Sequence, residues 1–254
     1  MWIVSKSGSQ WPIASQEASR AHGSGRCLAF PTGTVSRTDD VVSRKRLSLR
    51  FQLVRREPRQ APSVIVAMHV FLDFEASSLK AGSYPIEVGW AREDGETEAH
   101  LIRPAPGWLD WDATAEAVHK IEHDLLLTEG EPYDAVARRV LEALAPHQVF
   151  VSAPSWDGKW MSVLLRAAGL PRHALKLKDC DLANRAVARE VLGGRMSGRE
   201  LEGAIVWIVA EARRRVQAGP PRHRALADAV AELEVWREVR KLAETLAAER
   251  PVGA

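Results

Sequence analysis

The chain has 254 residues, of which 46% are hydrophobic and 27% charged, enough for one globular domain with a core and an appendage. Its 35 basic and 33 acidic residues leave a net charge of +2, which excludes proteins that bind nucleic acid by bulk charge alone. Two cysteines, Cys27 and Cys180, exclude a disulfide framework and a four-thiolate zinc site, and favour a cytoplasmic location. No apolar run reaches the roughly 18 residues that span a bilayer, so we expect no membrane insertion.

The first 67 residues differ from the rest in charge and composition. They hold 11 Lys and Arg against 4 Asp and Glu, a net charge of +7, whereas residues 68–254 carry −5. Ten of the seventeen serines lie here without sustained periodicity, so we predict a disordered extension. Its composition also fits an organelle transit peptide. Two interpretations stay open: a basic arm for nucleic acid, or upstream sequence included through a wrong start codon, with the domain beginning at Met68.

From residue 64 onward the sequence alternates between strand-like and helical segments. Val64–Phe74 is a near-continuous apolar run and predicts a central strand buried on both faces. The Asp-Gly pair within Glu93–Glu96 favours a hairpin. The predicted strands are 64–74, 85–92, 98–103, 149–152 and 175–178, and the predicted helices are 113–127, 132–144, 156–168, 179–192, 198–216 and 222–249. Strands and hairpins first, with helices between and after them, predict an α/β sandwich with a mixed sheet.

Two acidic residues, Asp73 and Glu75, lie at the end of the first predicted strand. Side chains two residues apart on a strand share one face of the sheet. An acidic pair on a buried face destabilises the fold unless each charge is paired or bound to a cation. Hard divalent cations such as Mg²⁺ or Mn²⁺ are the natural partners of carboxylates. The simpler alternative is a strand end at which both acids reach water.

Two later segments carry residues of the same kind. Asp157 follows the predicted strand 149–152, and loops after strands are where α/β sheets place their ligands. An ordinary helix N-cap would also explain this aspartate. Pro220–Ala229 opens the last helix with His223 and Asp228, which lie on neighbouring helix faces and border one cleft only if it sits over the helix start. A first-turn histidine with a solvated aspartate is the alternative.

Together these three segments resemble the DEDDh branch of the 3′–5′ exonuclease superfamily, the group that includes RNase T and the proofreading epsilon subunit of bacterial DNA polymerase III. The resemblance covers residues 68 to about 235. Asp73 and Glu75 match the first motif of the family, and Asp157 matches the second. The third motif is the most specific, because the His-Arg-Ala-Leu-Ala-Asp-Ala run that begins at His223 is close to the family's H-x-A-L-x-D-A.

Other segments resemble the family less closely. Val118–Ile121 resembles its V-H-G-I segment, with Lys120 where glycine is usual, and Tyr84–Gly89 resembles its second strand. Around the second motif the family often has N-x-x-F-D, whereas here Ala153 replaces the asparagine and Trp156 the phenylalanine. These replacements leave the acid intact, but they change how the second motif is braced.

The resemblance implies a fold, an activity and a set of site residues. The fold is an RNase H-like mixed sheet flanked by helices, formed by residues 68–254. The activity is metal-dependent removal of nucleotides from the 3′ end of RNA or single-stranded DNA, with release of nucleoside 5′-monophosphates. The implied metal ligands are Asp73, Glu75, Asp157 and Asp228, which hold two divalent cations, Mg²⁺ or Mn²⁺. His223 completes the catalytic set as the general base on the attacking water.

The same resemblance provides candidates for substrate binding. Aromatic faces that stack on unstacked bases contribute about 1–3 kcal/mol each, and hydroxyl groups after the first motif offer hydrogen bonds near the terminal sugar. Core packing is the equal alternative for the aromatic residues, and Phe74 should point away from the acids on either side of it. The substrate-binding candidates are Phe74, Ser77, Ser78, His119, Ile121, Trp156 and Trp160.

Two other functions and several partner questions stay open. The altered second motif and the basic arm suggest a nucleic-acid-binding module of the same fold with weak turnover, and a phosphoesterase for very short oligonucleotides is the third candidate. Trp108 and Trp111 read as exposed loop residues or a packed lid, and Arg222 and Arg224 offer phosphate contacts. The expected partners are 3′ ends of single-stranded RNA or DNA. The apolar stripe of the last helix covers either the core or a homodimer partner.

Overall fold

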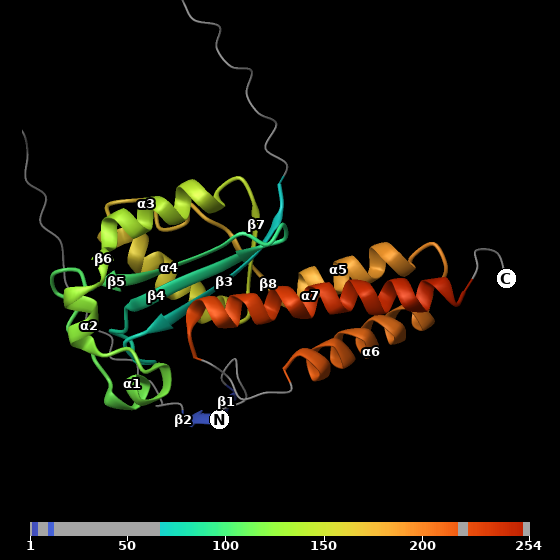
Figure 1. Cartoon of the computed structure of the whole chain (residues 1–254), viewed down its shortest axis with the longest axis horizontal. Helices are drawn as coiled ribbons and strands as arrows, with labels where there is room; N and C mark the ends of the chain where they lie inside the picture. Colours follow the sequence, from blue (N-terminus) through green and yellow to red (C-terminus); the bar gives the residue numbers. More distant parts are fainter. Residues whose placement is uncertain (1, 5–9, 13–66, 218–222, 251–254) are drawn as a thin grey trace, which may run out of the picture. The chain divides into compact units, whose positions relative to one another are not determined.

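The computed structural model describes residues 2–4, 10–12, 67–217 and 223–250. Near the N-terminus, β1 (Trp2–Val4) and β2 (Gln10–Pro12) pair in a two-stranded sheet of their own. The rest of the basic extension lies outside the described residues, so its disorder stays a prediction. The sheet and helices discussed below all belong to the described residues from 67 onward (Figure 1).

A six-stranded mixed sheet forms the centre of this region, with the strand order β6-β5-β4-β3-β7-β8. The antiparallel pairs are β3–β4 and β4–β5, and the parallel pairs are β5–β6, β3–β7 and β7–β8. The strands are β3 His69–Ala76, β4 Pro85–Arg92, β5 Thr97–Arg103, β6 Glu131–Pro132, β7 Gln148–Val151 and β8 Leu177–Asp179. Because β3 has neighbours on both sides, the predicted central strand and mixed α/β sheet are confirmed.

Helices cover both faces of this sheet. The helices are α1 Ala113–His119, α2 His123–Thr128, α3 Tyr133–Leu144, α4 Pro154–Ala167, α5 Cys180–Leu192, α6 Gly198–Val216 and α7 Ala225–Ala248. In Figure 1, α3 and α4 lie on one side of the sheet, whereas α7 crosses the other side with α5 and α6 packed against it. Within the described ranges, we find no helix that is long and apolar enough to cross a membrane.

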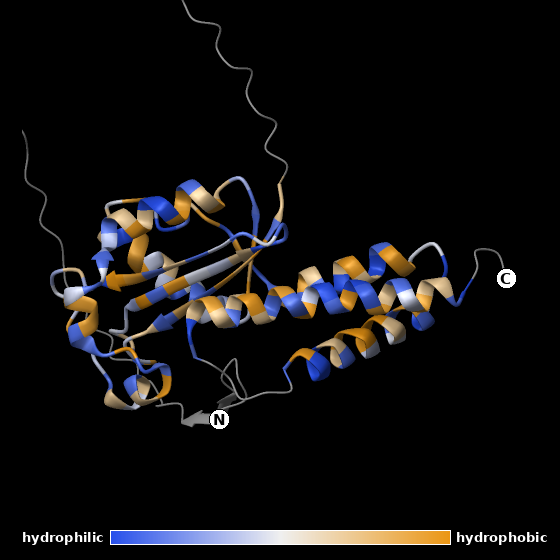
Figure 2. Ribbon diagram, in the orientation of Figure 1, coloured by the Kyte–Doolittle hydropathy of each residue, from blue (hydrophilic) through white to orange (hydrophobic). Residues whose placement is uncertain are grey.

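Alternation along β3 separates two hydrophobic cores. Leu72 and Phe74 point to the side of α3 and α4, where they pack with Trp160. Phe71 points to the opposite side and packs with Trp236 of α7. Hydrophobic and hydrophilic stretches alternate around α3, α5 and α7 in Figure 2, as expected of helices that pack on the sheet or on neighbouring helices and face solvent elsewhere. Because β3 lies between these two cores, it is buried on both faces, which explains the near-continuous apolar run in its sequence.

The segment predicted as one helix over 113–127 is two helices, so that prediction was wrong in its continuity. Lys120 ends α1 in the left-handed conformation, with φ at 58°, and its backbone N–H donates to the Glu116 carbonyl. This conformation costs a non-glycine residue about 1–2 kcal/mol. Lysine has a high helix propensity, so residue 120 itself does not indicate that the helix ends there.

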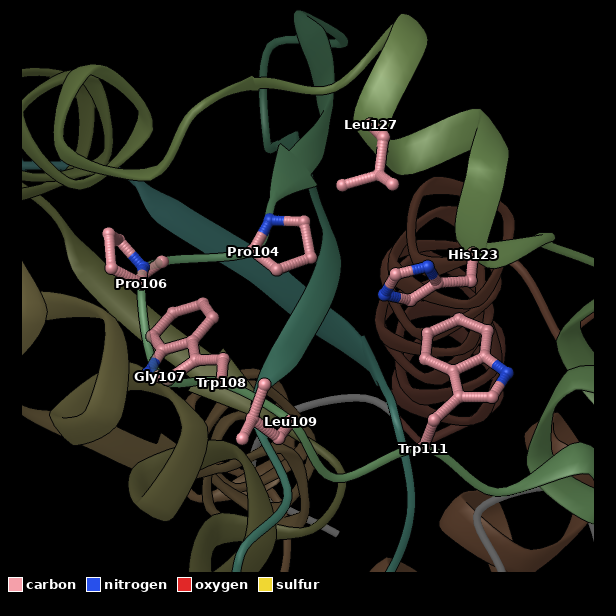
Figure 3. Close-up of a pocket in the computed structure, with 9 residues that line it drawn as sticks. Pro104, Pro106, Gly107, Trp108, Leu109, Trp111, His123 and Leu127 are labelled. Carbon is pink, nitrogen blue, oxygen red and sulfur yellow. The ribbon is translucent and has the colours of Figure 1, made fainter.

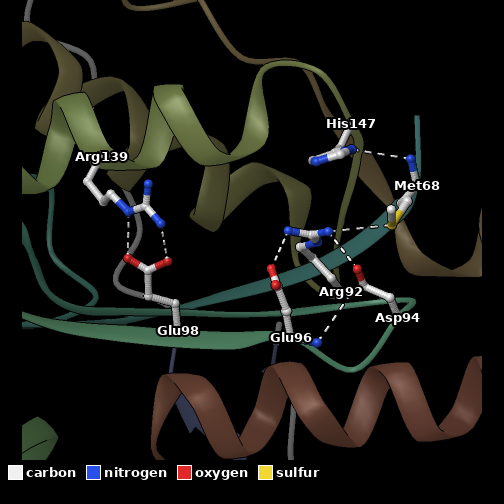
Figure 4. A network of polar contacts seen from close by, with 7 residues as sticks. All are labelled: Met68, Arg92, Asp94, Glu96, Glu98, Arg139 and His147. Atoms are coloured by element: carbon white, nitrogen blue, oxygen red, sulfur yellow. Dashed lines mark hydrogen bonds and ion pairs between the residues drawn. The ribbon is translucent and has the colours of Figure 1, made fainter. Parts of the chain in front are cut away.

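The hairpin between β4 and β5 forms where the Asp-Gly pair predicts it. Gly95 takes the positive φ of 97° that the turn requires, and Arg92 Nη2 donates to Asp94 Oδ2 over 2.6 Å. Along the neighbouring strand, Arg139 of α3 binds both carboxylate oxygens of Glu98 on β5 over 2.7 and 2.8 Å (Figure 4). Exposed pairs of this kind contribute at most about 1 kcal/mol each, so they position the sheet edge more than they stabilise it.

Candidate active site

β3 brings Asp73 and Glu75 to the side of the sheet that faces α7. Both residues share that face with Phe71, which packs in the core beneath α7, whereas Phe74 between them belongs to the opposite core. Asp73 is 3% exposed and Glu75 is half-buried. The two acids therefore stand side by side on one face, as the spacing predicts.

The third carboxylate comes from the start of α7. Gly89 on β4 is the register partner of Asp73, and a Cβ at this glycine would overlap the backbone nitrogen of Leu226 and lie 2.6 Å from its Cα. The first turn of α7 therefore packs directly on the strand beside Asp73. One carboxylate oxygen each from Asp73, Glu75 and Asp228 lie within 4.8 Å of one another. The structure thus assembles residues that are 155 positions apart in the sequence.

Asp157 lies at the start of α4 and is fully buried. The N-cap of α4 is Ala153, so Asp157 is not the cap itself, but its Oδ2 accepts a hydrogen bond from the Ala153 backbone N–H over 3.1 Å. β7 runs parallel to β3 and delivers this turn to the same end of the sheet. Asp157 does not belong to the group of three carboxylates within 4.8 Å, and its role as a metal ligand stays a prediction.

His223 stands two residues before α7, half-buried and in the left-handed conformation with φ at 50°. The following residue, Arg224, is the N-cap of α7 but provides no side-chain cap. Glu87 of β4 takes that place, because its carboxylate accepts from the Ala225 backbone N–H over 2.9 Å and from the Arg224 guanidinium over 2.5 Å. Sequence reasoning missed Glu87, although a glutamate in an otherwise apolar strand is a signal of a buried polar contact.

His119 is buried at the end of α1, near the third motif. Its Nδ1 accepts a hydrogen bond from the Ile121 backbone N–H over 3.1 Å, and its Nε2 has no hydrogen-bond partner among the described residues. Burial, together with the positive charge of Arg224, lowers the pKa of His119 from 6.5 to about 4, against the opposing effect of nearby acids. The ring is therefore neutral at pH 7 and presents an Nε2–H donor.

Three other predicted substrate-binding residues are held by the protein itself. Ser77 and Ser78 are at most 1% exposed; the Ser77 hydroxyl accepts from the Tyr84 backbone N–H, and the Ser78 hydroxyl donates to Asp110. Ile121 is 1% exposed and packs in a small cluster with Tyr84. These contacts fix the loop after β3 and the end of α1, so the hydroxyl groups already have partners inside the protein.

The three predicted aromatic residues differ in exposure. Phe74 and Trp160 are 2% and 5% exposed and belong to the core beneath α3 and α4, with Trp160 Nε1 donating to the Ser83 hydroxyl. Trp156 is half-buried at the start of α4 and stacks on Trp160, with ring centroids 5.5 Å apart. Trp156 alone among these three therefore keeps surface that a base can contact.

An apolar hollow of about 640 Å³ opens between α2 and the loop after β5 (Figure 3). Trp108 stacks on the buried Tyr84 with ring centroids 5.0 Å apart, and Trp111 meets the His123 ring edge-on at 4.9 Å. Both tryptophans are partly buried, so they form fixed walls of the hollow rather than a fully exposed loop. The Trp111 ring also lies edge-on to the His119 ring, with ring centroids 6.2 Å apart.

Comparison with known proteins gives a fold but not a family. No protein-family model and no curated protein matches the chain. E. coli exonuclease I in complex with a dT13 oligonucleotide matches with a TM-score of 0.52 at 16% identity, over 72% of this chain and 43% of that chain. Exonuclease I of Methylocaldum szegediense matches with a TM-score of 0.52 at 17% identity, over 72% of this chain and 43% of that chain.

A likeness at this level of identity shows the fold alone. The described domain shares its fold with part of exonuclease I, which confirms the expected exonuclease-type fold. The narrower resemblance to RNase T and the epsilon subunit stays a prediction. The chain spans less than half the length of these relatives, so their activity and substrates do not carry over from the likeness itself.

Proposed function

We propose that this chain is a metal-dependent 3′–5′ exonuclease, which hydrolyses the terminal phosphodiester bond of single-stranded DNA or RNA and releases nucleoside 5′-monophosphates. The observation that carries the proposal is the meeting of Asp73, Glu75 and Asp228 within 4.8 Å. His223 lies at the start of the helix that supplies Asp228. The shared fold supports the proposal, although many functions occur on one fold and the chemistry must come from the site.

The three carboxylates fit a divalent metal site. Their ligand atoms are all oxygens, the donors that Mg²⁺ and Mn²⁺ prefer, and like charges this close destabilise one another unless a cation compensates them. We assign two cations to the site, with Asp73, Glu75 and Asp228 as ligands and Asp157 as the fourth, partly through water. When bound, the cations stabilise the negative charge on the attacking and leaving oxygens.

His223 is the general base in this proposal. One of its imidazole nitrogens takes a proton from the attacking water, whose oxygen forms a bond to the phosphorus of the terminal nucleotide. The bond from that phosphorus to the 3′ oxygen of the preceding nucleotide breaks, and this oxygen takes up a proton to become the new 3′-hydroxyl. The terminal nucleotide leaves with its phosphate on the 5′ carbon.

Two residues are the best substrate contacts among those predicted. His119 is neutral at pH 7, and its Nε2–H is a buried donor without a partner in the described structure, which suits an oxygen of the terminal nucleotide. Trp156 keeps exposed ring surface, and we assign it to stacking on a base. The hydroxyl groups of Ser77 and Ser78 bind within the protein and reach a sugar only if those bonds exchange.

Single-stranded DNA is the favoured substrate. The exonuclease I structures that resemble this chain hold dT13 and dA16 oligonucleotides, and one holds a zinc ion together with single-stranded DNA. RNA remains the second candidate, because recognition of the 2′-hydroxyl depends on local contacts. A cytoplasmic location and a homodimer stay predictions from the sequence.

The proposal is tested by the length ladder left from 5′-labelled single-stranded DNA and RNA in the presence of Mg²⁺ or Mn²⁺, with Asp73→Ala as the inactive control. We expect stepwise shortening from the 3′ end that disappears in the control. Binding in a shift assay without any shortening would contradict the proposal and favour a nucleic-acid-binding module. Cleavage confined to the shortest oligonucleotides would instead favour a phosphoesterase.

A further inference from the structure

Glu87 is a buried carboxylate that the mechanism above does not use. It lies in β4, whose first seven residues are all buried, and is 3% exposed. Its register partner on β3 is Glu75, so the carboxylate stands beside the proposed metal ligands on the side of α7. A buried charge destabilises a fold unless hydrogen bonds and an opposite charge compensate it, so its partners are the key to its role.

Those partners are two consecutive residues at the start of α7. Arg224 Nε donates to both Glu87 oxygens over 3.1 Å, and Arg224 Nη2 donates to Oε1 over 2.5 Å. The Ala225 backbone N–H donates to Oε2 over 2.9 Å, which satisfies a group that the first turn of a helix leaves without a partner. A carboxylate at a helix N-terminus also interacts favourably with the helix dipole. The strand therefore caps the helix from outside.

The cap fixes the backbone next to His223. Two positions further along β4, Gly89 admits the backbone of Leu226, so the first turn of α7 contacts the strand at two points. His223 immediately precedes Arg224, whose three hydrogen bonds to Glu87 we call the clamp. His223 has a φ of 50°, a conformation that persists in a non-glycine residue only when the surroundings impose it. Glu87 bonds to both residues that follow this strained residue, Arg224 and Ala225.

We propose that Glu87 is a positioning residue for His223: by clamping Arg224 and capping Ala225, it fixes the backbone that carries the imidazole at the start of the helix that supplies Asp228. This inference rests on the proposed function for its catalytic meaning, whereas the positioning itself is a statement about structure. The clamp also keeps the Arg224 guanidinium on Glu87. The hydrogen bond with Glu87 raises the pKa of Arg224, and electrostatic attraction to Glu75 adds to this effect. Both carboxylates therefore attract the guanidinium.

The first experiment measures the position of His223 without reference to catalysis. In the full chain with ¹³C-labelled histidine, the ring resonance of His223 is compared between the wild type and Glu87→Gln, with His147, the residue before β7, as the reference. We expect the His223 resonance to move or broaden and the His147 resonance to stay. An unchanged His223 resonance in a folded Glu87→Gln protein would overturn the proposal whether or not the chain is a nuclease.

The second experiment measures turnover on 5′-labelled single-stranded DNA. We expect Glu87→Gln to lower kcat by about 10²-fold, near the lower end of a general-base contribution, with KM and the Mg²⁺ dependence little changed. In a His223→Ala background the same substitution should have almost no further effect. Equal losses in both backgrounds would show a role independent of His223 and overturn the proposal.

Arg224→Gln provides a second variant if Glu87→Gln does not fold. The Arg224 side chain is half exposed and takes no part in the bond from the Ala225 N–H to Glu87, so its loss removes the clamp and leaves the donor of the helix cap in place. We expect an intermediate loss of kcat that also vanishes in the His223→Ala background, and Arg224→Lys should recover part of it. Wild-type turnover by Arg224→Gln would contradict the clamp. A wild type that is no more active than Asp73→Asn would refute the nuclease function, and the resonance experiment would still decide the positioning.

Discussion

The two faces of β3 and β4 differ sharply, although they alternate residue by residue along the same strands. The face toward α3 and α4 carries Leu72, Phe74, Val88 and Trp90, all at most 2% exposed. The face toward α7 carries Asp73, Glu75, Glu87 and Gly89. Because the side-chain period of a strand is two, one face is apolar along this stretch, while the other carries charge and admits a helix backbone next to the core residues Phe71 and Ala91. The comparison predicts that substitutions one residue apart affect different properties.

The largest expected effect is on turnover. Asp73→Asn should lower kcat on single-stranded DNA by about 10⁴-fold, because a bound cation contributes several kcal/mol of charge stabilisation and each 1.36 kcal/mol is tenfold in rate. The free energy of unfolding should stay the same or rise, since one of three neighbouring like charges is removed. Turnover assays and urea unfolding measure the two quantities, with the exposed Asp124→Asn as the matched control. A kcat within tenfold of the wild type would remove the distinction between the faces.

The adjacent residue should behave in the opposite way. Phe74→Ala should lower the free energy of unfolding by about 3–5 kcal/mol, because it leaves a cavity in the core beneath α3 and α4. Phe74→Leu should cost less and leave a folded protein whose kcat is close to that of the wild type. Urea unfolding and turnover of Phe74→Leu check this. A kcat loss as large as that of Asp73→Asn would mean that Phe74 contacts the substrate after all.

The pH dependence of the free energy of unfolding tests the buried imidazole of His119, because the apolar core of the described residues contains no group that titrates in this way. Burial holds the pKa of His119 at about 4 in the folded protein, below its value of 6.5 in the unfolded chain, so the unfolded chain binds the proton first as the pH falls. The contribution of His119 is complete above pH 6.5, and about 3 kcal/mol of stability is lost as the pH falls from 6.5 to 4.

His119→Asn isolates this effect, because the amide oxygen can keep the hydrogen bond from the Ile121 backbone N–H. Urea unfolding from pH 7 to pH 4 should show a shallower loss of stability in the variant than in the wild type. Other carboxylates titrate in the same range in both proteins, so only the difference between the two curves reports on His119. Parallel curves would show that the ring is accessible to protons in the folded state.

Local patterns in the sequence predicted the features that are set within a single strand or helix. The shared face of Asp73 and Glu75, the opposite orientation of Phe74, the bounds of β4 and those of α6 all follow from periodicity and turn residues. The third motif placed His223 and Asp228 at one helix start. These features need no knowledge of what packs against them.

The remaining features depend on contacts between distant segments. Glu87 reads as one polar residue in an apolar strand, and its partners lie 137 and 138 positions away. From the sequence alone, Gly89 is expected to weaken the same strand. Only the fold shows that the backbone of α7 occupies the space that a side chain would fill. Lys120 favours a continuous helix by propensity, yet the fold imposes a left-handed conformation on it. Tertiary packing decided each of these positions.

The smallest predicted effect tests the contact that brings α7 to the sheet. Gly89→Ala should lower the free energy of unfolding by about 1–3 kcal/mol, since the added methyl group meets the backbone of Leu226, which cannot rotate away. Gly158→Ala in α4 is the matched control, because a Cβ there meets nothing within 4 Å and should stabilise the helix by about 0.5–1 kcal/mol. Urea unfolding measures both variants. If Gly89→Ala loses no stability but loses turnover, α7 has moved away from β3 and carried Asp228 with it; if it loses neither, the close approach is not what assembles the three carboxylates.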